Sequence, residues 1–513
     1  MASRFNVTTS TPSQLESESW VESIHLDRAL PRAGNFVRAH WLKLLGISVA
    51  VLIPCFWHRH IEAGDLGSHV YNAWLAQLIR HGQAPGLWIA HPWSNVLFDY
   101  ILSGFGTLFG LPAGEKISVA LAILIFFWGT FAIVAATACR APWFLTPLLA
   151  MVAYGWSFEM GFLNYCLSLG LSFFALAILW RGRGTERWMA MALVPFIYLA
   201  HPLGLLWLFA AGAYISIAER VPLRLQVLVM LGSAGCLFLL RWYLWHHFIV
   251  STADEPLYIF NGGDQLVLFG NRYEIVEALL GVFVVAAMAF DAFTRRHQRG
   301  FWRAYSIPLE LFVLAEVGVF LLPDGVRAEG QAVALALLTK RLTTVSAILI
   351  CCLLGAMLPR KWHLIALAGI AAVFFSFLYQ DTAIVNRMEA QVERLVRTLP
   401  PGTRVMATIR KPDESRVLMQ HIVDRACVGH CWSYGNYEPP SAAFRIRASD
   451  GNRIVMMDSG DTASMEEGDY TVQAEDLPAY QIYQCREDWT ELCIRPLAEG
   501  ESNDRLGIHP ESE

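Results

Sequence analysis

Long apolar runs recur along the first three quarters of the chain, separated by short polar and basic stretches. A helix needs about 20 mostly apolar residues to cross the roughly 30 Å hydrocarbon layer of a membrane. Several of the runs approach this length, and others are shorter. The pattern predicts a polytopic α-helical membrane bundle of about eleven transmembrane helices, at residues 41–57, 117–138, 143–157, 160–180, 187–201, 202–218, 223–246, 275–294, 305–323, 342–358 and 362–380.

Composition supports this prediction. Apolar residues make up 55% of the chain and charged residues only 16%, less than the roughly one quarter typical of soluble domains. From residue 381 onward, however, there are 23 acidic and 14 basic side chains, against 21 and 25 before it. Residues 381–513 are therefore predicted to form a soluble, mildly acidic domain, and the charge pattern indicates no nucleic-acid partner.

Basic residues set the expected orientation, because Lys and Arg favour the cytoplasmic side of a membrane. Eleven crossings put every basic cluster on that side: Arg28, Arg32, Arg38, Arg181, Arg183, Arg187, Arg220, Arg224, Arg295, Arg296, Arg299, Arg303, Arg360 and Lys361. Residues 1–40 lack the apolar core of a signal peptide and are predicted to be a cytoplasmic arm. Residues 41–380 would then be the transmembrane domain of a multi-pass protein of the inner (plasma) membrane, with residues 381–513 extracytoplasmic.

Residues 91–110 have two interpretations. With eleven crossings this stretch is a helix lying at the outer interface, since a further crossing would turn Arg181–Arg187 outward. Alternatively it crosses the membrane, and residues 188–218 form one long helix bent at His201-Pro202. The number of crossings stays odd either way.

Four cysteines lie in the predicted outer domain: Cys427, Cys431, Cys485 and Cys493. In an oxidising compartment they are expected to pair, most simply Cys427 with Cys431 and Cys485 with Cys493, although three connectivities exist. A metal site is the alternative, because His421 and His430 flank this region. The CxxC doublets of zinc ribbons are missing.

The outer domain begins with a helical pattern over residues 382–399, which Pro400-Pro401-Gly402 ends. Five strand-like runs follow, predicting a small α+β domain with an antiparallel sheet: TRVMAT, NRIVMMD, DYTVQA, YQIYQC and ELCIRPL. Residues 430–448 are rich in aromatic, Asn and Arg side chains. They suit either carbohydrate contact or a packed loop.

Candidate chemistry lies in the first outer loop. Asp65, His69 and Asn72 are spaced i, i+4 and i+7, on one face of a predicted interfacial helix. A carboxylate with an imidazole one turn away is an arrangement suited to a general base. Alternatively, Asp65 is an N-cap that accepts hydrogen bonds from the amides of Gly67 and Ser68.

The whole pattern resembles the GT-C glycosyltransferases, which include the lipid A aminoarabinose transferases and the protein O-mannosyltransferases. The resemblance rests on Gly64-Asp65 in the first loop, the 97–110 stretch ending in Leu-Phe-Gly, the AYGWSFEMGFLNY turn and His201 in IYLAHPLGLLW. It implies sugar transfer from a polyprenyl phosphate to a glycan, lipid or protein acceptor, with Asp65 as the base. Several members carry a second acidic residue beside the first, whereas here Leu66 follows, so Glu62 or Asp99 would have to supply it.

The resemblance also suggests residues that would bind the donor phosphate and contact the substrates. The donor phosphate needs cations, and the candidates are Arg241, Arg272, Lys340 and Arg341, although Lys340 and Arg341 also suit lipid headgroups. Candidates for substrate contact are His69, Asn72, Asp99, Glu159, Asn164 and His201, while Asp254, Glu255 and Asp264 of a second outer loop suit sugar hydroxyls or a turn. A divalent cation stays open, because some members use one, yet the first loop carries no metal-binding cluster.

Two other functions fit the same composition. A lipid-linked sugar flippase would be expected to contain two related halves, and no internal repeat is visible. A membrane scaffold that binds a partner through its C-terminal domain would not need Asp65.

Overall fold

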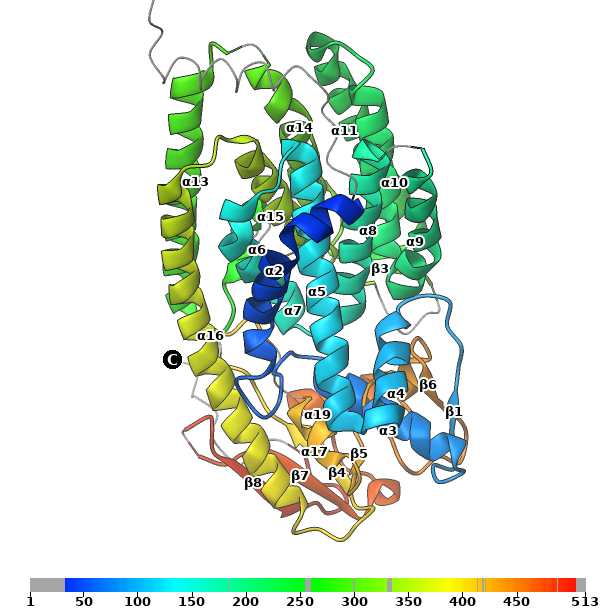
Figure 1. The fold of residues 1–513 in the computed structure, drawn as a ribbon. Coiled ribbons are helices and arrows are strands. Elements are labelled where there is room, and N and C mark those ends of the chain that lie inside the picture. Colours follow the sequence, from blue (N-terminus) through cyan, green and yellow to red (C-terminus); the bar gives the residue numbers. More distant parts are fainter. Residues whose placement is uncertain are drawn as a thin grey trace, which may run out of the picture.

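The computed structural model describes residues 33–182, 184–253, 260–298, 300–329, 335–412, 414–417, 419, 421–486 and 488–503. Most of the predicted cytoplasmic arm, Arg183, Arg299 and the pair Asp254-Glu255 lie outside them. The molecule is mostly helical, with a long bundle and a smaller mixed region at one end (Figure 1). A single apolar core runs through the bundle.

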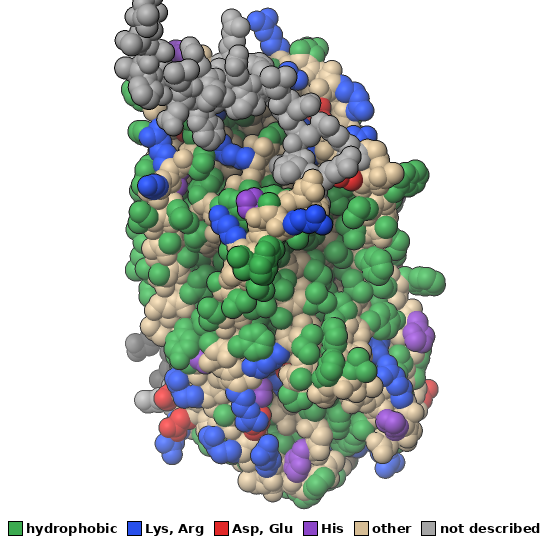
Figure 2. All heavy atoms as spheres, in the orientation of Figure 1, with side chains coloured by type: hydrophobic (Ala, Val, Ile, Leu, Met, Phe, Trp, Pro, Cys, Tyr) green, Lys and Arg blue, Asp and Glu red, His purple; other side chains and the backbone are tan. Residues whose placement is uncertain are grey.

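Eight helices of the described chain are long and apolar enough to cross a membrane. They are α2 (Ala33–Leu52), α5 (Leu111–Ala138), α8 (Leu163–Arg181), α11 (Leu223–His247), α13 (Glu274–Arg295), α14 (Phe301–Leu321), α15 (Leu338–Ala356) and α16 (Lys361–Val396). Shorter helices lie among them: α6 (Thr146–Ala153), α7 (Trp156–Glu159), α9 (Glu186–Ala200) and α10 (Pro202–Ala218). Apolar side chains cover the middle of the face in Figure 2, and most Lys and Arg side chains lie toward its two ends.

Helix ends that carry predicted cytoplasmic arginines meet at one end of the bundle. Arg181 Nε donates to the Ala136 carbonyl at 2.9 Å, joining the last turns of α8 and α5. Arg295 Nη1 donates to the Ala356 carbonyl at 3.2 Å, joining the last turns of α13 and α15. The C-terminal region lies at the opposite end of the bundle (Figure 1).

Within residues 91–110 the structure has a helix of 13 residues, too short to span a membrane upright. This helix, α4 (Leu97–Phe109), packs against α3 (Leu66–Arg80) and the start of α5. Helices α9 and α10 are separate, because His201 between them has an extended backbone (φ −164°, ψ 134°). Both observations agree with the interfacial interpretation and not with one long bent helix over 188–218.

The boundary expected near residue 380 falls inside a continuous helix. The apolar run 362–380 and the helical pattern 382–399 merge into the 36 residues of α16, because Gln380 and Asp381 do not interrupt helical geometry. The far end of α16 extends beyond the bundle and packs against the C-terminal region (Figure 1).

The C-terminal region contains a four-stranded sheet in the order β5-β4-β7-β8. Its strands are β4 (Arg404–Thr408), β5 (Trp432–Ser433), β7 (Ala479–Gln484) and β8 (Leu492–Pro496), and its helices are α17 (Ile422–Cys427), α18 (Glu438–Ser441) and α19 (Ser459–Glu467). Three predicted strands are confirmed, but residues 452–458 and 469–474 form no named strand. The sheet is mixed: β4 runs parallel to β5 and β7, and β7 runs antiparallel to β8.

The segment between α2 and α5, predicted to be the first outer loop, forms one packed unit with the C-terminal region. Strand β1 (Leu87–Ile89) of the loop pairs antiparallel with β6 (Ile446–Ala448). Tyr71 and Leu75 of α3 are fully buried in the same apolar cluster as Val392 of α16 and Ile482 of β7. Elsewhere, β2 (Ile249–Ser251) pairs with β3 (Gly325–Arg327).

The four cysteines of the C-terminal region pair as expected. Cys427 bonds Cys431, and Cys485 bonds Cys493. The first bridge ties the end of α17 to the residue before β5.

Candidate functional site

Asp65 immediately precedes α3, yet its side chain does not cap the helix. Its backbone N–H donates to the Met160 carbonyl at 3.1 Å, and the N–H of Gly64 donates to the Glu159 carbonyl at 2.7 Å. The carboxylate is about one fifth exposed (20%). The N-cap interpretation is therefore wrong, and the carboxylate is not held by the helix amides.

Glycines allow the turn before α3 to lie against the turn after α7. A Cβ on Gly64 would lie 2.5 Å from the Met160 carbonyl oxygen. Gly161 has φ +82°, and a Cβ there would lie 2.5 Å from the backbone nitrogen of Asp65. The position of Asp65 is thus set by backbone contacts that no larger residue permits.

His69 lies one turn after Asp65 and binds Asp99 of α4. The distance from His69 Nδ1 to Asp99 Oδ1 is 2.8 Å, and Asn164 Nδ2 donates to the other Asp99 oxygen at 3.0 Å. Burial lowers the pKa of His69, but the charge and hydrogen bond of Asp99 outweigh this and raise the pKa to about 9. Three predicted site residues from α3, α4 and α8 thus form one hydrogen-bonded line.

The C-terminal region covers this line with residues from the 430–448 stretch. Glu438 Oε1 lies 3.9 Å from His69 Nδ1, and Asn436 Nδ2 donates to Asn72 Oδ1 at 2.9 Å. Arg445 Nη1 donates to the Asp99 carbonyl at 3.1 Å. Burial, opposed by the charge of His69, raises the pKa of Glu438 to about 8. These buried contacts make the stretch a packed loop that also forms one wall of the site.

His421 and Asp424 complete the surroundings of Asp65, and sequence reasoning assigned them no catalytic role. His421 Nε2 lies 3.6 Å from Asp65 Oδ1, and His421 Nδ1 lies 2.9 Å from Asp424 Oδ2. Burial lowers the pKa of His421, but the hydrogen bond and charge of Asp424 raise it to about 10. The i, i+3 spacing of His421 and Asp424 was the available signal, and only the fold brings it to Asp65.

Arg341 and His201 lie together in the bundle near this site. Arg341 Nη1 is 3.4 Å from His201 Nε2, and the guanidinium lies over the ring of Phe162, 4.2 Å from its centroid. The Asp65 N–H bonds to the carbonyl of Met160, two residues before Phe162, so Arg341 and Asp65 contact neighbouring parts of the same turn. Within the described residues Arg341 forms no ion pair, and its Nε is buried without a hydrogen-bond partner. Leaving a partly buried cation without a carboxylate is costly, so this one is suited to an anionic ligand.

The other predicted site residues make contacts away from Asp65. Arg272 is paired with Asp381 at 2.5 Å, and Arg241 donates to the Leu321 carbonyl at 2.6 Å. Lys340 lies over the ring of Trp156, 5.7 Å from its centroid. Glu159 is buried, and burial, followed by the charges of Glu62 and Asp381, raises its pKa well above the ordinary value.

Asp264, in the segment between α11 and α13 that was predicted to be a second outer loop, is bound to the bundle. It accepts a hydrogen bond from the Thr343 hydroxyl at 2.7 Å and is 4% exposed. This contact agrees with a structural role in the turn.

A buried charge cluster includes Glu62, three residues before Asp65. Arg425 of α17 contacts three carboxylates: Glu115 of α5 at 2.5 Å, Glu389 of α16 at 2.8 Å and Glu62 of the first loop at 3.5 Å. We call these four residues the Arg425 cluster. It joins the bundle, the first loop and the C-terminal region through a single guanidinium.

A recess adjoins the site between the first loop and the C-terminal region. Its volume is about 300 Å³, including space open to solvent, and Glu62, Gly64, His421 and Arg425 line it with apolar neighbours. No group of three or more His, Cys, Asp or Glu side chains in the described ranges is arranged to hold a metal ion.

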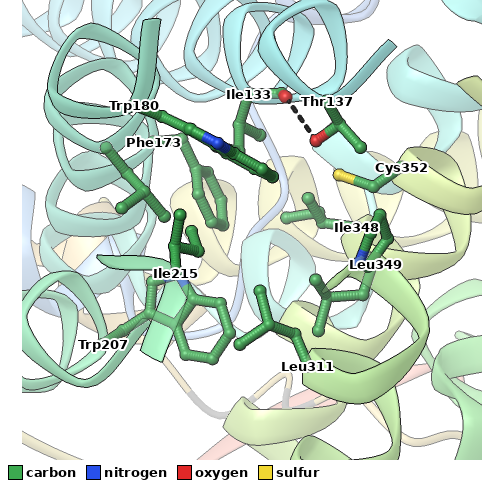
Figure 3. Close-up of a pocket in the computed structure, with 12 residues that line it drawn as sticks. Ile133, Thr137, Phe173, Trp180, Trp207, Ile215, Leu311, Ile348, Leu349 and Cys352 are labelled. Atoms are coloured by element: carbon green, nitrogen blue, oxygen red, sulfur yellow. Dashed lines mark hydrogen bonds between the residues drawn. The ribbon is translucent and has the colours of Figure 1, made fainter. Parts of the chain in front are cut away.

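A second cavity, of about 330 Å³, lies within the bundle. Figure 3 shows its lining of aliphatic and aromatic side chains, including Trp180, Trp207 and Leu311. Thr137 is bonded to the Ile133 carbonyl at 2.9 Å, so this cavity presents almost no polar chemistry and contains none of the predicted site residues.

The candidate site therefore combines a partly exposed carboxylate, two histidines that are hydrogen-bonded to aspartates, and a partly buried guanidinium. Comparisons with models of protein families, with curated proteins and with solved structures find no match for the chain.

Proposed function

We propose that the chain is an integral membrane glycosyltransferase that moves a sugar from a polyprenyl phosphate to an acceptor on the outer face of a membrane. One observation carries the proposal: the carboxylate of Asp65 is free of its own helix and lies 3.6 Å from Nε2 of His421, in a region that also contains Arg341 without an ion pair among the described residues. A base near a partly buried cation suits a reaction in which a nucleophile is deprotonated and a phosphate departs.

In this proposal Asp65 accepts the proton of the acceptor hydroxyl or amine. The nucleophile attacks the anomeric carbon, and the bond from that carbon to the phosphate oxygen breaks. The bonding electrons leave with the polyprenyl phosphate, whose charge Arg341 neutralises. His69, Asp99 and Asn164, which are hydrogen-bonded to one another, form one wall of the site. Catalysis would come mostly from positioning and electrostatics.

Membrane insertion with eleven crossings is part of the same proposal. The eight long helices would be joined by α9, α10 and the segment containing α6, which run beside them in the bundle. The end of the bundle at which Arg181 and Arg295 lie would then be cytoplasmic, and the candidate site would be extracytoplasmic. This location suits a donor that arrives by diffusion in the membrane.

Native Cys139 tests this orientation, because it is an exposed free cysteine at the arginine end of α5. We expect a membrane-impermeant maleimide to label Cys139 in inside-out vesicles and not in intact cells. Cys139→Ser is the control that identifies the labelled site. Labelling of Cys139 from the outside of intact cells would reverse the proposed orientation.

Donor binding is tested with the guanidinium of Arg341. Arg341→Gln is expected to weaken binding of farnesyl phosphate to the purified protein by roughly 10- to 100-fold, since a charge-assisted interaction is lost. Arg241→Gln is the matched control, because Arg241 of α11 is bonded to the Leu321 carbonyl at the end of α14. Binding would be followed by isothermal titration calorimetry in detergent. Equal losses in both variants would contradict a specific phosphate role for Arg341.

A further inference from the structure

His421 of the C-terminal region lies 3.6 Å from Asp65 and has no role in the mechanism proposed above. His421 precedes α17, and a hydrogen bond to Asp424 at 2.9 Å fixes its Nδ1. The other Asp424 oxygen is hydrogen-bonded by the Ser433 hydroxyl. Asp424 therefore has both oxygens committed, and the imidazole cannot rotate without breaking this pair.

The backbone of His421 is also fixed. Gly67 of α3 packs so closely on it that a Cβ at Gly67 would lie 2.1 Å from the His421 carbonyl oxygen. On the other side, the ring of Tyr437 has its centroid 5.2 Å from that of His421. The first loop and the C-terminal region thus hold the imidazole from both sides.

The Nε2 of His421 points at Asp65 without forming a hydrogen bond. The separation of 3.6 Å between Nε2 and Asp65 Oδ1 is longer than a normal hydrogen bond. A protonated imidazole donates from both nitrogens, so this N–H and the facing carboxylate can each bind a ligand. This arrangement suits two substrates bound side by side. The hydroxyl or amine of the acceptor would contact Asp65, and an anionic oxygen of the donor would contact His421.

We propose that His421, oriented by Asp424, is a second phosphate-binding group of the site and donates from Nε2 to a phosphate oxygen of the polyprenyl-phosphate donor. This inference rests on the proposed function and extends it, because one phosphate ligand would come from the bundle, through Arg341, and the other from the C-terminal region. The donor site would then be complete only when the C-terminal region is docked on the first loop.

Charges around His421 keep it cationic at neutral pH. Asp424 and Glu466 of the C-terminal region and Asp65 of the first loop all favour the imidazolium. Without the Asp424 carboxylate, the pKa of His421 is expected to fall toward its ordinary value of about 6.5. Binding through a charged His421 would then decline as the pH rises above neutrality.

The experiment measures binding of farnesyl phosphate to the full-length protein in detergent. His421→Gln is expected to weaken binding by roughly 10- to 100-fold, and His421→Lys to recover part of the loss because it restores the cation. His430→Gln is the matched control, since His430 lies in the same region and contacts the Leu399 carbonyl at 2.9 Å. A thermal unfolding scan of each variant identifies any that fail to fold.

A pH series separates binding from mere structural support. Asp424→Asn is expected to lose affinity relative to wild type between about pH 7 and 9, as His421 deprotonates. His69 titrates in the same range in both proteins and cancels in the ratio of the two affinities. The charge of Asp424 also raises the pKa of Glu438, so both proteins carry Glu438→Gln in this comparison.

Two outcomes would overturn the inference. If His421→Gln binds the probe as tightly as wild type while Arg341→Gln does not, the phosphate role of His421 is wrong and the proposed function is unaffected. If wild type itself binds no farnesyl phosphate, the proposed donor is wrong and the inference falls with it.

Discussion

Asp65→Asn is expected to slow sugar transfer by about a hundred- to ten-thousand-fold, the range that general base catalysis contributes. Asparagine keeps the shape of the side chain but cannot accept the proton of the acceptor. Because Asp65 makes no capping hydrogen bond to α3, the thermal unfolding temperature should stay close to that of wild type. The assay follows transfer of labelled sugar from a polyprenyl phosphate in proteoliposomes.

A true capping aspartate provides the control for this experiment. Asp458 accepts hydrogen bonds from the amides of Gly460 and Asp461 at the start of α19, at 2.7 and 3.1 Å. Asp458→Ala should therefore cost about 1 kcal/mol of stability and leave transfer unchanged. Transfer by Asp65→Asn at the wild-type rate would rule out Asp65 as the base.

Arg425→Met is expected to cause the largest loss of stability, about 3–5 kcal/mol, because it leaves buried carboxylates without their counter-ion. Glu62, Glu115 and Glu389 are at most 6% exposed at their side chains. Thermal unfolding in detergent measures the loss, and limited proteolysis should show the C-terminal region cleaved faster. Arg59→Met is the control: Arg59 is 63% exposed and pairs with Glu393, so its loss should cost at most about 1 kcal/mol.

Neutralising the carboxylates should rescue the Arg425 variant. Combining Arg425→Met with glutamine at Glu62, Glu115 and Glu389 is expected to restore much of the stability, since no unpaired charge is then buried. No recovery in the combined variant would mean that Arg425 acts through packing and not through charge.

The Arg425 cluster also predicts a pH dependence of stability. Burial raises the pKa of Glu62, the charge of Arg425 opposes this, and the result is about 7, against 4.5 for an ordinary glutamate. A raised pKa in the folded state contributes stability that is complete below pH 4.5 and is lost as the pH rises through about 7. The Glu62→Gln variant should lack this part of the pH profile.

Local periodicity predicted much of the bundle and the placement of several residues of the candidate site. The apolar runs identified the long helices, and the i, i+4, i+7 spacing placed His69 and Asn72 on the helix that follows Asp65. Asp99, Asn164, His201 and Arg341 were also predicted, because polar groups among apolar helices are costly and therefore few.

Contacts between distant segments could not be predicted from the sequence. His421 lies 356 positions from Asp65, and its approach depends on the pairing of β1 with β6 and on the absence of a side chain at Gly67. Residues 452–458 have β-forming side chains but no partner strand, so tertiary packing overrides their propensity. The prediction of an antiparallel sheet was wrong for the same reason: β4 pairs in parallel with β5 and β7, and the pairing of distant strands is not encoded in any one of them.

The uninterrupted course of α16 constrains how the molecule moves. At 1.5 Å per residue its 36 residues form a rod of about 54 Å, anchored in the bundle at one end and holding Glu389 near the other. Because Arg425 is paired with Glu389, a change in the tilt of α16 is expected to move Arg425, and with it Asp424 and His421. In the proposed membrane-spanning arrangement, the packing that sets helix tilt then also sets the geometry around Asp65.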